Sequence, residues 1–192
     1  MLILIDPGHG GTDPGAVATT GQREDRTNLN VAGYLKTALE AAGHTVIMTR
    51  TAHDQTVSIA ARQAVIKAER PDLVISIHHN GASAASAHGA EVCAQINSLT
   101  GAYDNKSYRL AGFILSEFET LGQNIRGIIR KANSSGNADY YGILRTAATY
   151  GIPAVITEYA FMTAADVCDV DTYAEQKAEA EAIAKAVKEY AA

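Results

Sequence analysis

Two histidines and a glutamate in the first half of the chain have the chemistry of metal ligands. His9 lies in the glycine-rich segment "DPGHGG" after an apolar run, and His78 follows a second apolar run, "LVISI". Glu24 lies between them, just before the first expected long helix. Zn²⁺ accepts two imidazoles and one carboxylate in a tetrahedral arrangement that leaves its fourth position to water. The three residues are therefore a candidate zinc site, and the glycines at positions 8, 10 and 11 would let the backbone fold closely around the ion.

A further carboxylate, Glu158, ends the apolar run "PAVITE". Water bound to zinc has its pKa lowered toward ~7, which makes a nucleophile available at neutral pH. A carboxylate at the lip of a sheet can take the proton of that water and pass it to a departing amine. Burial raises the pKa of such a carboxyl and a nearby cation lowers it, and the sequence leaves both outcomes open.

Each of these residues also has a purely structural interpretation. His9 fits a turn histidine that hydrogen-bonds to the backbone, and Glu24 fits a charge in the first turn of a helix, which the helix dipole favours. Glu158 fits one half of an ion pair with an arginine. The segment "DPGHGG" has some likeness to a phosphate-binding loop, but it lacks the GxGxxG and GK[ST] patterns. Because side chains alternate along a strand, His78 and His79 point to opposite faces, and at most one of them is a ligand.

Alternating strands and helices provide the framework that positions these side chains. Apolar runs bounded by turn residues indicate strands, and apolar residues at helical spacing indicate helices. The expected strands cover 2–5, 45–49, 73–77, 89–96, 143–145 and 154–158, and the expected helices cover 28–42, 57–69, 107–121 and 173–190. This alternation predicts an α/β domain around a mostly parallel sheet. Ligands of such sheets bind at the carboxyl ends of strands, so His9, His78 and Glu158 are expected to meet at one edge.

Length and composition restrict the class of protein further. The 192 residues are expected to form one domain, 1–192, and a hydrophobic fraction of 47% is typical of a globular protein. The net charge of −5, without a dense cluster of Lys and Arg, argues against nucleic acid as a partner. No apolar run approaches the ~20 residues that span a bilayer, and Met1 leads into a strand without a signal peptide. Cys93 and Cys168 lack CxxC spacing, so a disulfide framework is not expected, while a single bridge between them stays open.

Taken together, the motifs resemble those of the zinc-dependent N-acetylmuramoyl-L-alanine amidases of the type-three amidase family, over the whole chain. "LIDPGHGGTDPGA" is similar to the opening zinc motif of the family, and "GQREDRTNLN" to its second motif, in which a Glu precedes an Asn-Leu pair. "TRTAHD" with the later Arg62, "DLVISIHHNGA" and "GAE" resemble the motifs that follow. "ILRTAATYGIPAVITEYAFMT" resembles the last motif, which carries the catalytic glutamate.

The resemblance implies a zinc hydrolase. It implies that His9, Glu24 and His78 hold one Zn²⁺ ion per chain. It also implies that Glu158 is the catalytic acid and base. The implied fold is a three-layer domain with a twisted sheet of about six strands and helices on both faces. The implied reaction is hydrolysis of the amide that joins the lactyl group of N-acetylmuramic acid to L-Ala of the peptidoglycan stem peptide.

A departure from the family pattern bears on the expected substrate contacts. The family usually has Ala where His79 stands, so the resemblance selects His78 as the ligand and suggests an extra imidazole at the border of the site. His79 and Asn80 are therefore expected to contact substrate, together with Arg126 in the polar, glycine-containing segment 122–137.

The expected partner is peptidoglycan, and the expected place of action is the cell wall, extracellular or periplasmic. A phage lysin and a trimmed domain of a secreted bacterial enzyme both fit the sequence. We expect a monomer, and fusion to a wall-binding domain in a longer protein stays open. Two other functions stay open: a zinc peptidase that cuts within the stem peptide, and a wall-binding domain without activity.

Overall fold

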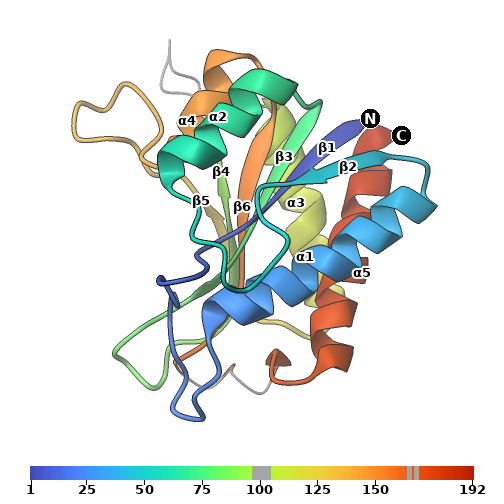
Figure 1. The fold of residues 1–192 in the computed structure, drawn as a ribbon. Helices are drawn as coiled ribbons and strands as arrows, with labels where there is room; N and C mark the ends of the chain where they lie inside the picture. Colours follow the sequence, from blue (N-terminus) through green and yellow to red (C-terminus); the bar gives the residue numbers. More distant parts are fainter. Residues whose placement is uncertain (97–104, 164–165, 167–168) are drawn as a thin grey trace.

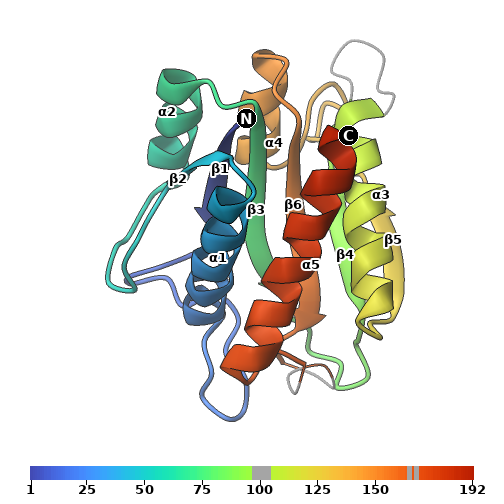
Figure 2. The same cartoon turned by 90° about the vertical axis from the view of Figure 1, so that its right-hand side faces the viewer.

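In the residues that the structure describes, 1–96, 105–163, 166 and 169–192, the computed structural model has six strands and five helices (Figure 1). The strands are β1 (Leu2–Pro7), β2 (Thr45–Met48), β3 (Leu73–Asn80), β4 (Ala90–Ala94), β5 (Ile125–Ile129) and β6 (Ala154–Phe161). The helices are α1 (Glu24–Ala41), α2 (Ile59–Glu69), α3 (Asn105–Thr120), α4 (Gly142–Thr149) and α5 (Tyr173–Ala191). Helices α1, α3 and α5 lie side by side on one face of the sheet, and α2 and α4 lie on the other (Figure 2). The expected three-layer α/β fold is confirmed.

The sheet is mixed but mostly parallel, with strand order β2–β1–β3–β6–β4–β5. Strand β1 pairs in parallel with β2 and β3, and β3 pairs in parallel with β6. Strand β4 runs antiparallel to β6, and β5 runs parallel to β4. Pro7 lies beside Ile77, and His78 lies beside Glu158. The carboxyl ends of β1, β3 and β6 therefore meet at one edge of the sheet.

The fifth strand and the fourth helix correct the sequence prediction. Residues 143–145, expected as a strand, belong to α4, and β5 lies inside the polar, glycine-containing segment 122–137, where no strand was expected. In α4, Ile143, Leu144 and Ala147 are buried, a spacing that a three-residue apolar run does not reveal. Strand β5 lies at the sheet edge without a clear alternation of burial, and Gly127 within it has a positive φ of 117°. Such a strand leaves little periodic signal in the sequence.

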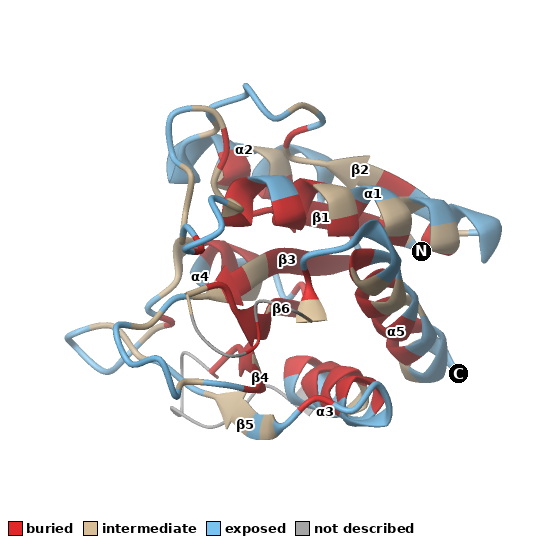
Figure 3. Ribbon diagram, turned by 90° about the horizontal axis from the view of Figure 1, so that it is seen from below, coloured by how far each residue is buried: buried red, intermediate tan, exposed pale blue. Residues whose placement is uncertain are grey.

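Apolar side chains pack against both faces of the sheet. In Figure 3 the buried residues follow the central strands and the inward sides of the helices. One core cluster joins α1, α3 and α5 to the sheet, and a smaller one lies under α2 and α4. Strands β1, β3 and β6 are buried on both faces, which explains their uninterrupted apolar runs. The two layers of helices fix these strands, and with them the edge where their polar ends lie.

The described part of the chain bears on two further expectations, which concern membrane-spanning segments and the two cysteines. None of its helices combines the length and apolar character that a membrane span requires. Cys93 is buried in β4 with a free thiol, and Cys168 lies outside the described residues.

Candidate metal centre and active site

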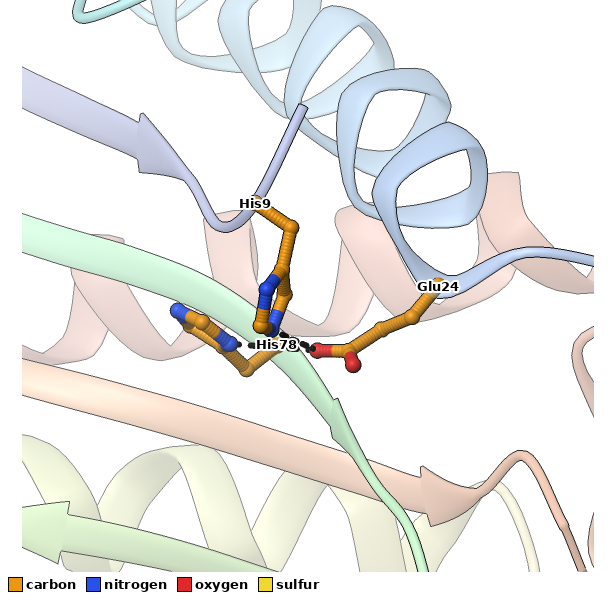
Figure 4. A group of neighbouring side chains, drawn as sticks. All are labelled: His9, Glu24 and His78. Atoms are coloured by element: carbon orange, nitrogen blue, oxygen red, sulfur yellow. Dashed lines mark hydrogen bonds and ion pairs between the residues drawn. The ribbon is translucent and has the colours of Figure 1, made fainter. Parts of the chain in front are cut away.

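His9, Glu24 and His78 meet at the carboxyl edge of the sheet, with their side chains pointing toward one another (Figure 4). Glu24 Oε1 lies 3.2 Å from His9 Nε2 and 3.1 Å from His78 Nδ1. One ligand atom from each residue lies within 4.8 Å of the other two. Two imidazole nitrogens and one carboxylate oxygen at this spacing fit the donor set of a zinc site with an open position.

The order of the strands and the start of α1 explain this meeting. His9 follows β1 and His78 lies near the end of β3, which pairs with β1 in parallel. The loop after His9 returns the chain to the same edge, where α1 begins at Glu24. His9 itself adopts a positive φ of 58°, which is uncommon for a residue other than glycine. The cluster is therefore assembled by a strained turn, a strand end and the first turn of a helix.

Hydrogen bonds and charges within the cluster shift the pKa values of His9 and Glu24. Burial lowers the pKa of His9, but hydrogen bonds and charges from Glu24 and Asp13 more than offset this and raise the pKa to about 9. Burial raises the pKa of Glu24, but the two histidines outweigh it and hold the pKa of this carboxyl well below its usual range. The Glu24 carboxylate thus favours positive charge at this position. A divalent cation and the His9 proton would compete for the same atoms.

Close approach of the backbone makes room for the ligand side chains. A Cβ atom at Gly8 would lie 2.2 Å from Cε1 of His78, and one at Gly15 would lie 2.4 Å from Oε2 of Glu24. No side chain fits at either position without displacing a residue of the cluster. The need for glycine at position 8 in "DPGHGG" therefore comes from the imidazole of His78.

The next two glycines serve a different contact. A Cβ atom at Gly10 would lie 2.6 Å from the backbone oxygen of Gln55, and one at Gly11 would lie 2.1 Å from Oγ1 of Thr56. These positions let the turn pack against the segment before α2. All three glycines were expected to let the backbone fold around an ion. In the structure, only Gly8 of the three lies against the side chain of a candidate ligand.

We predict that Gly8→Ala destabilises the protein by about 1–3 kcal/mol, because the added methyl group must displace the His78 ring. Urea unfolding of the variant and the wild type measures the difference. Gly33→Ala in α1 is the matched control, since a Cβ there meets no atom within 4 Å and alanine favours helix. Equal stability of Gly8→Ala and the wild type would show that the ring has room to move.

Two buried arginines hold the turn that carries His9. Arg50 donates hydrogen bonds to the backbone oxygens of Gly8 at 2.8 Å and Asp25 at 2.6 Å. Arg62 donates to the backbone oxygen of His9 at 2.6 Å. Both side chains are almost fully buried. The bonds to Gly8 and His9 are charge-assisted and satisfy carbonyl groups of the irregular turn, and the bond to Asp25 joins the turn to the start of α1. Arg50 of "TRTAHD" and the later Arg62 therefore support the site from beneath.

Glu158 lies beside the cluster on β6. It pairs in register with His78 on β3 and with Glu91 on β4. Its Oε2 atom is shielded from solvent and has no hydrogen-bond partner among the described residues. Burial, with smaller contributions from the charges of Glu24 and Glu91, raises the pKa of this carboxyl well above its usual value. An unpartnered carboxylate oxygen beside three ligand atoms is suited to exchange a proton with a molecule bound there.

A cavity opens in front of this carboxylate. It has a volume of about 270 Å³, and its lining includes His9, His78, Tyr141 and Glu158. The cavity lies between the sheet edge and the first turns of α2 and α4, since Ile59 and Gly142 also line it. Substrate atoms in this cavity would contact the imidazoles and the carboxylate together.

The raised pKa of Glu158 predicts a stability difference that depends on pH. A carboxyl with a raised folded-state pKa contributes its full stability below its ordinary pKa of 4.5 and loses it as pH rises through the folded-state value. We therefore expect Glu158→Gln to stabilise the metal-free protein at pH 7 by about 1–2 kcal/mol. Urea unfolding at pH 7 and pH 4 measures the effect, which is expected to vanish at the lower pH. A gain that is equal at both values would exclude ionisation of Glu158 as its cause.

The three expected substrate contacts lie in different places. His79 points away from the cavity: its side chain is buried with 0% exposure between α1 and α5, which does not fit the expected substrate contact. Asn80 Nδ2 donates to Glu91 at 3.1 Å, and Arg126 Nε donates to the other carboxylate oxygen of Glu91 at 2.8 Å. The structure thus brings Asn80 and Arg126 together beside Glu158, and leaves His79 on the opposite face.

Sequence reasoning missed two residues near the cavity. Glu91 joins Asn80 to Arg126 and adds negative charge beside Glu158. Its place in "GAE" at the start of an expected strand was the available signal. Tyr141 lines the cavity as the residue immediately before α4. Because residues 143–145 were expected to be a strand, nothing placed Tyr141 at a helix start near the sheet edge.

A mixed sheet with two histidines and two glutamates at its carboxyl edge defines an α/β protein with a candidate hydrolytic centre. The family model described as N-acetylmuramoyl-L-alanine amidase matches residues 3–189. The chain belongs to the N-acetylmuramoyl-L-alanine amidase family. The expected membership of the amidase family is thereby confirmed.

Individual relatives agree with this assignment. N-acetylmuramoyl-L-alanine amidase AmiC of Neisseria meningitidis is 41% identical over 91 residues, which are 47% of this chain and 22% of that protein. Cwp6 from Clostridium difficile has a TM-score of 0.88 and 29% identity, and the match covers 100% of this chain and 29% of that chain. N-acetylmuramoyl-L-alanine amidase AmiC2 of Nostoc punctiforme has a TM-score of 0.83 and 27% identity, covering 100% and 97%. The chain thus spans about a fifth of the length of the first of these relatives.

Proposed function

We propose that this chain hydrolyses the amide bond between the lactyl group of N-acetylmuramic acid and L-Ala of the stem peptide in peptidoglycan. The observation that carries the proposal is the shielded, unpartnered Oε2 of Glu158 beside the cluster of His9, Glu24 and His78. Membership of the amidase family and the names of its relatives support the choice of bond.

The cofactor that we propose is one Zn²⁺ ion, held by His9, Glu24 and His78. Two nitrogens and one oxygen suit zinc, and the glycines at positions 8 and 15 leave the space that the ligand side chains occupy. When bound, zinc polarises a carbonyl oxygen and lowers the pKa of a coordinated water.

Glu158 moves the protons of the reaction. Its free carboxylate oxygen accepts a proton from the attacking water as the water oxygen bonds to the lactyl carbonyl carbon. The same proton then passes to the amide nitrogen, the carbon–nitrogen bond breaks, and L-Ala leaves with a neutral amine. Burial favours the protonated carboxyl between these two transfers, since it raises the pKa of Glu158.

For the substrate, we propose contacts from Asn80 and Arg126. Both side chains reach Glu91 on the strand next to Glu158, and the Arg126 side chain is 42% exposed. Its remaining guanidinium donors are available to carboxylates, which match the donor geometry of arginine. A stem peptide whose lactyl amide lies at Glu158 would place its own carboxylates within this region. His79 is not part of this proposal, because its side chain is buried on the other face.

The biological setting that we propose is the bacterial cell wall, with peptidoglycan as the partner and a monomer as the acting form. Names of relatives, such as "Probable cell wall amidase LytH" of Staphylococcus epidermidis, support this setting. A wall-binding domain elsewhere in a longer protein fits the length of such relatives, since this chain spans 48% of that protein. The domain boundaries 1–192 remain a prediction.

Mass spectrometry of a synthetic N-acetylmuramoyl tripeptide after incubation with the zinc-loaded protein tests the proposed bond. We expect free N-acetylmuramic acid and an intact tripeptide with a free L-Ala amine. Shorter peptides that still carry the sugar would instead indicate the zinc peptidase. Binding to purified peptidoglycan without any cleavage would indicate the wall-binding domain without activity.

A further inference from the structure

A chain of buried polar side chains extends from the Glu24 carboxylate into the layer of helices. Asn28 Nδ2 donates to Glu24 Oε1 at 3.3 Å, and Asn28 Oδ1 lies 2.8 Å from His79 Nδ1. On its other side, His79 Nε2 lies 3.1 Å from Oε2 of Glu179. Asn28, His79 and Glu179 are all buried. These side chains join α1, β3 and α5, and α1 packs against both β3 and α5 (Figure 2).

The direction of the hydrogen bonds follows from the inventory of donors. The Asn28 amide nitrogen also donates to the backbone oxygen of Gly8 at 3.3 Å, so this end of the amide faces two acceptors. Asn28 Oδ1 must then accept, and Nδ1 of His79 must carry the hydrogen. Without a donor on His79, the Asn28 oxygen would lose its hydrogen-bond partner at 2.8 Å. In the reverse orientation, Oδ1 would face the Glu24 carboxylate.

His79 touches Glu24 in a second way. Its backbone N–H donates to Glu24 Oε1 at 3.1 Å, the same oxygen that lies between His9 and His78. The amide of Asn28 and the backbone of residue 79 therefore both act on the oxygen that faces the candidate metal position. Hydrogen bonds of this kind to a ligand carboxylate orient the ligand.

Fold stability is a poor explanation for this network. Glu179 Oε1 is shielded from solvent and has no partner among the described residues. Burying a carboxylate and an imidazole is costly, and apolar side chains of similar size often serve a core equally well or better. Beyond Glu179 toward the C-terminus, the buried face of α5 is apolar and includes Ile183 and Ala186. The buried polar residue one turn earlier, Gln176, has hydrogen-bond partners on both sides of its amide. Packing alone therefore does not explain why His79 and Glu179 are buried together.

We propose that His79, supported by Glu179, is a positioning residue for the metal ligand Glu24. It fixes the amide of Asn28, and the amide in turn fixes Oε1 of Glu24 toward His9 and His78. This inference rests on the proposed metal site, because it assigns the network a role in metal binding. It also gives His79 a role different from the substrate contact expected from the sequence.

Zinc affinity, measured by competition with a chromogenic chelator, tests the proposal. We expect His79→Ala to bind Zn²⁺ about 10- to 100-fold more weakly than the wild type. The double variant His79→Asn/Glu179→Met keeps a nitrogen donor for Asn28 and removes the carboxylate that would lose its partner. It is expected to recover most of the lost affinity.

Ile183→Val is the matched control, because it removes a methyl group from the same buried face of α5 without touching the network. Thermal unfolding of each metal-free variant shows that it is folded. The proposal is overturned if His79→Ala binds zinc like the wild type, or if Ile183→Val loses as much affinity as His79→Ala. If the wild type binds no zinc, the metal site itself is wrong, and the positioning role falls with it.

Discussion

Glu158→Gln is expected to lower the turnover of an N-acetylmuramoyl peptide by about 10²- to 10⁴-fold, the range that general acid–base catalysis contributes. The amide of glutamine keeps the size of the side chain but does not accept and return a proton. Because Glu158 is not one of the clustered ligand residues, zinc content is expected to stay at the wild-type level. Turnover is measured by product formation, and bound zinc by elemental analysis of the same sample.

The pairing of these two readouts makes the outcome decisive. Loss of turnover with zinc retained would assign Glu158 to proton transfer. Wild-type turnover in Glu158→Gln would remove Glu158 from the reaction, and the free Oε2 atom would need another explanation. Loss of zinc together with turnover would show that Glu158 acts on the metal site.

His78→Ala is expected to abolish zinc binding at the concentrations that saturate the wild type. This variant removes one of three ligand atoms, so its loss should exceed the roughly 10- to 100-fold that an outer-shell contact contributes. Isothermal titration of the metal-free protein with Zn²⁺ measures the effect. Activity is expected to disappear with the metal.

His88→Ala provides the matched control for this prediction. His88 is exposed and its ring contacts the backbone oxygen of Ser86, outside the cluster. Removing this imidazole is expected to leave zinc affinity unchanged. Undiminished zinc binding by His78→Ala would contradict the ligand set, and equal losses in both variants would indicate binding to surface histidines.

The sequence was most informative where strands end in polar residues. The runs before His9, His78 and Glu158 are apolar because their strands are buried on both faces, and parallel strands bring their carboxyl ends to one edge. The meeting of these three side chains could therefore be predicted from the residues alone. Glu24 was a candidate ligand because of its residue type, but the alternation of strands and helices did not place it at this edge. The path of the loop between β1 and α1 depends on contacts that leave no periodic pattern.

The incorrect predictions for α4, β5 and His79 also have physical causes. The short helix α4 presents too few apolar residues to show its period, and the edge strand β5 is half-buried along most of its length, so its burial does not alternate. His79 follows the alternation rule, which directs it away from the face of His78. Its neighbours there, Asn28 and Glu179, are 51 and 100 residues distant in the sequence. Such a contact depends on the packing of α1 and α5, and no local pattern predicts it.

Stoichiometric zinc titration with simultaneous assay of amide cleavage tests the central claim most directly. Protein stripped of metal by a chelator is titrated with Zn²⁺, and cleavage of an N-acetylmuramoyl peptide is measured at each point. We predict that cleavage is absent at first, rises in proportion to bound zinc and reaches its maximum at a single ion per chain. Full cleavage by the metal-free protein, or zinc bound at this ratio without any cleavage, would contradict the account.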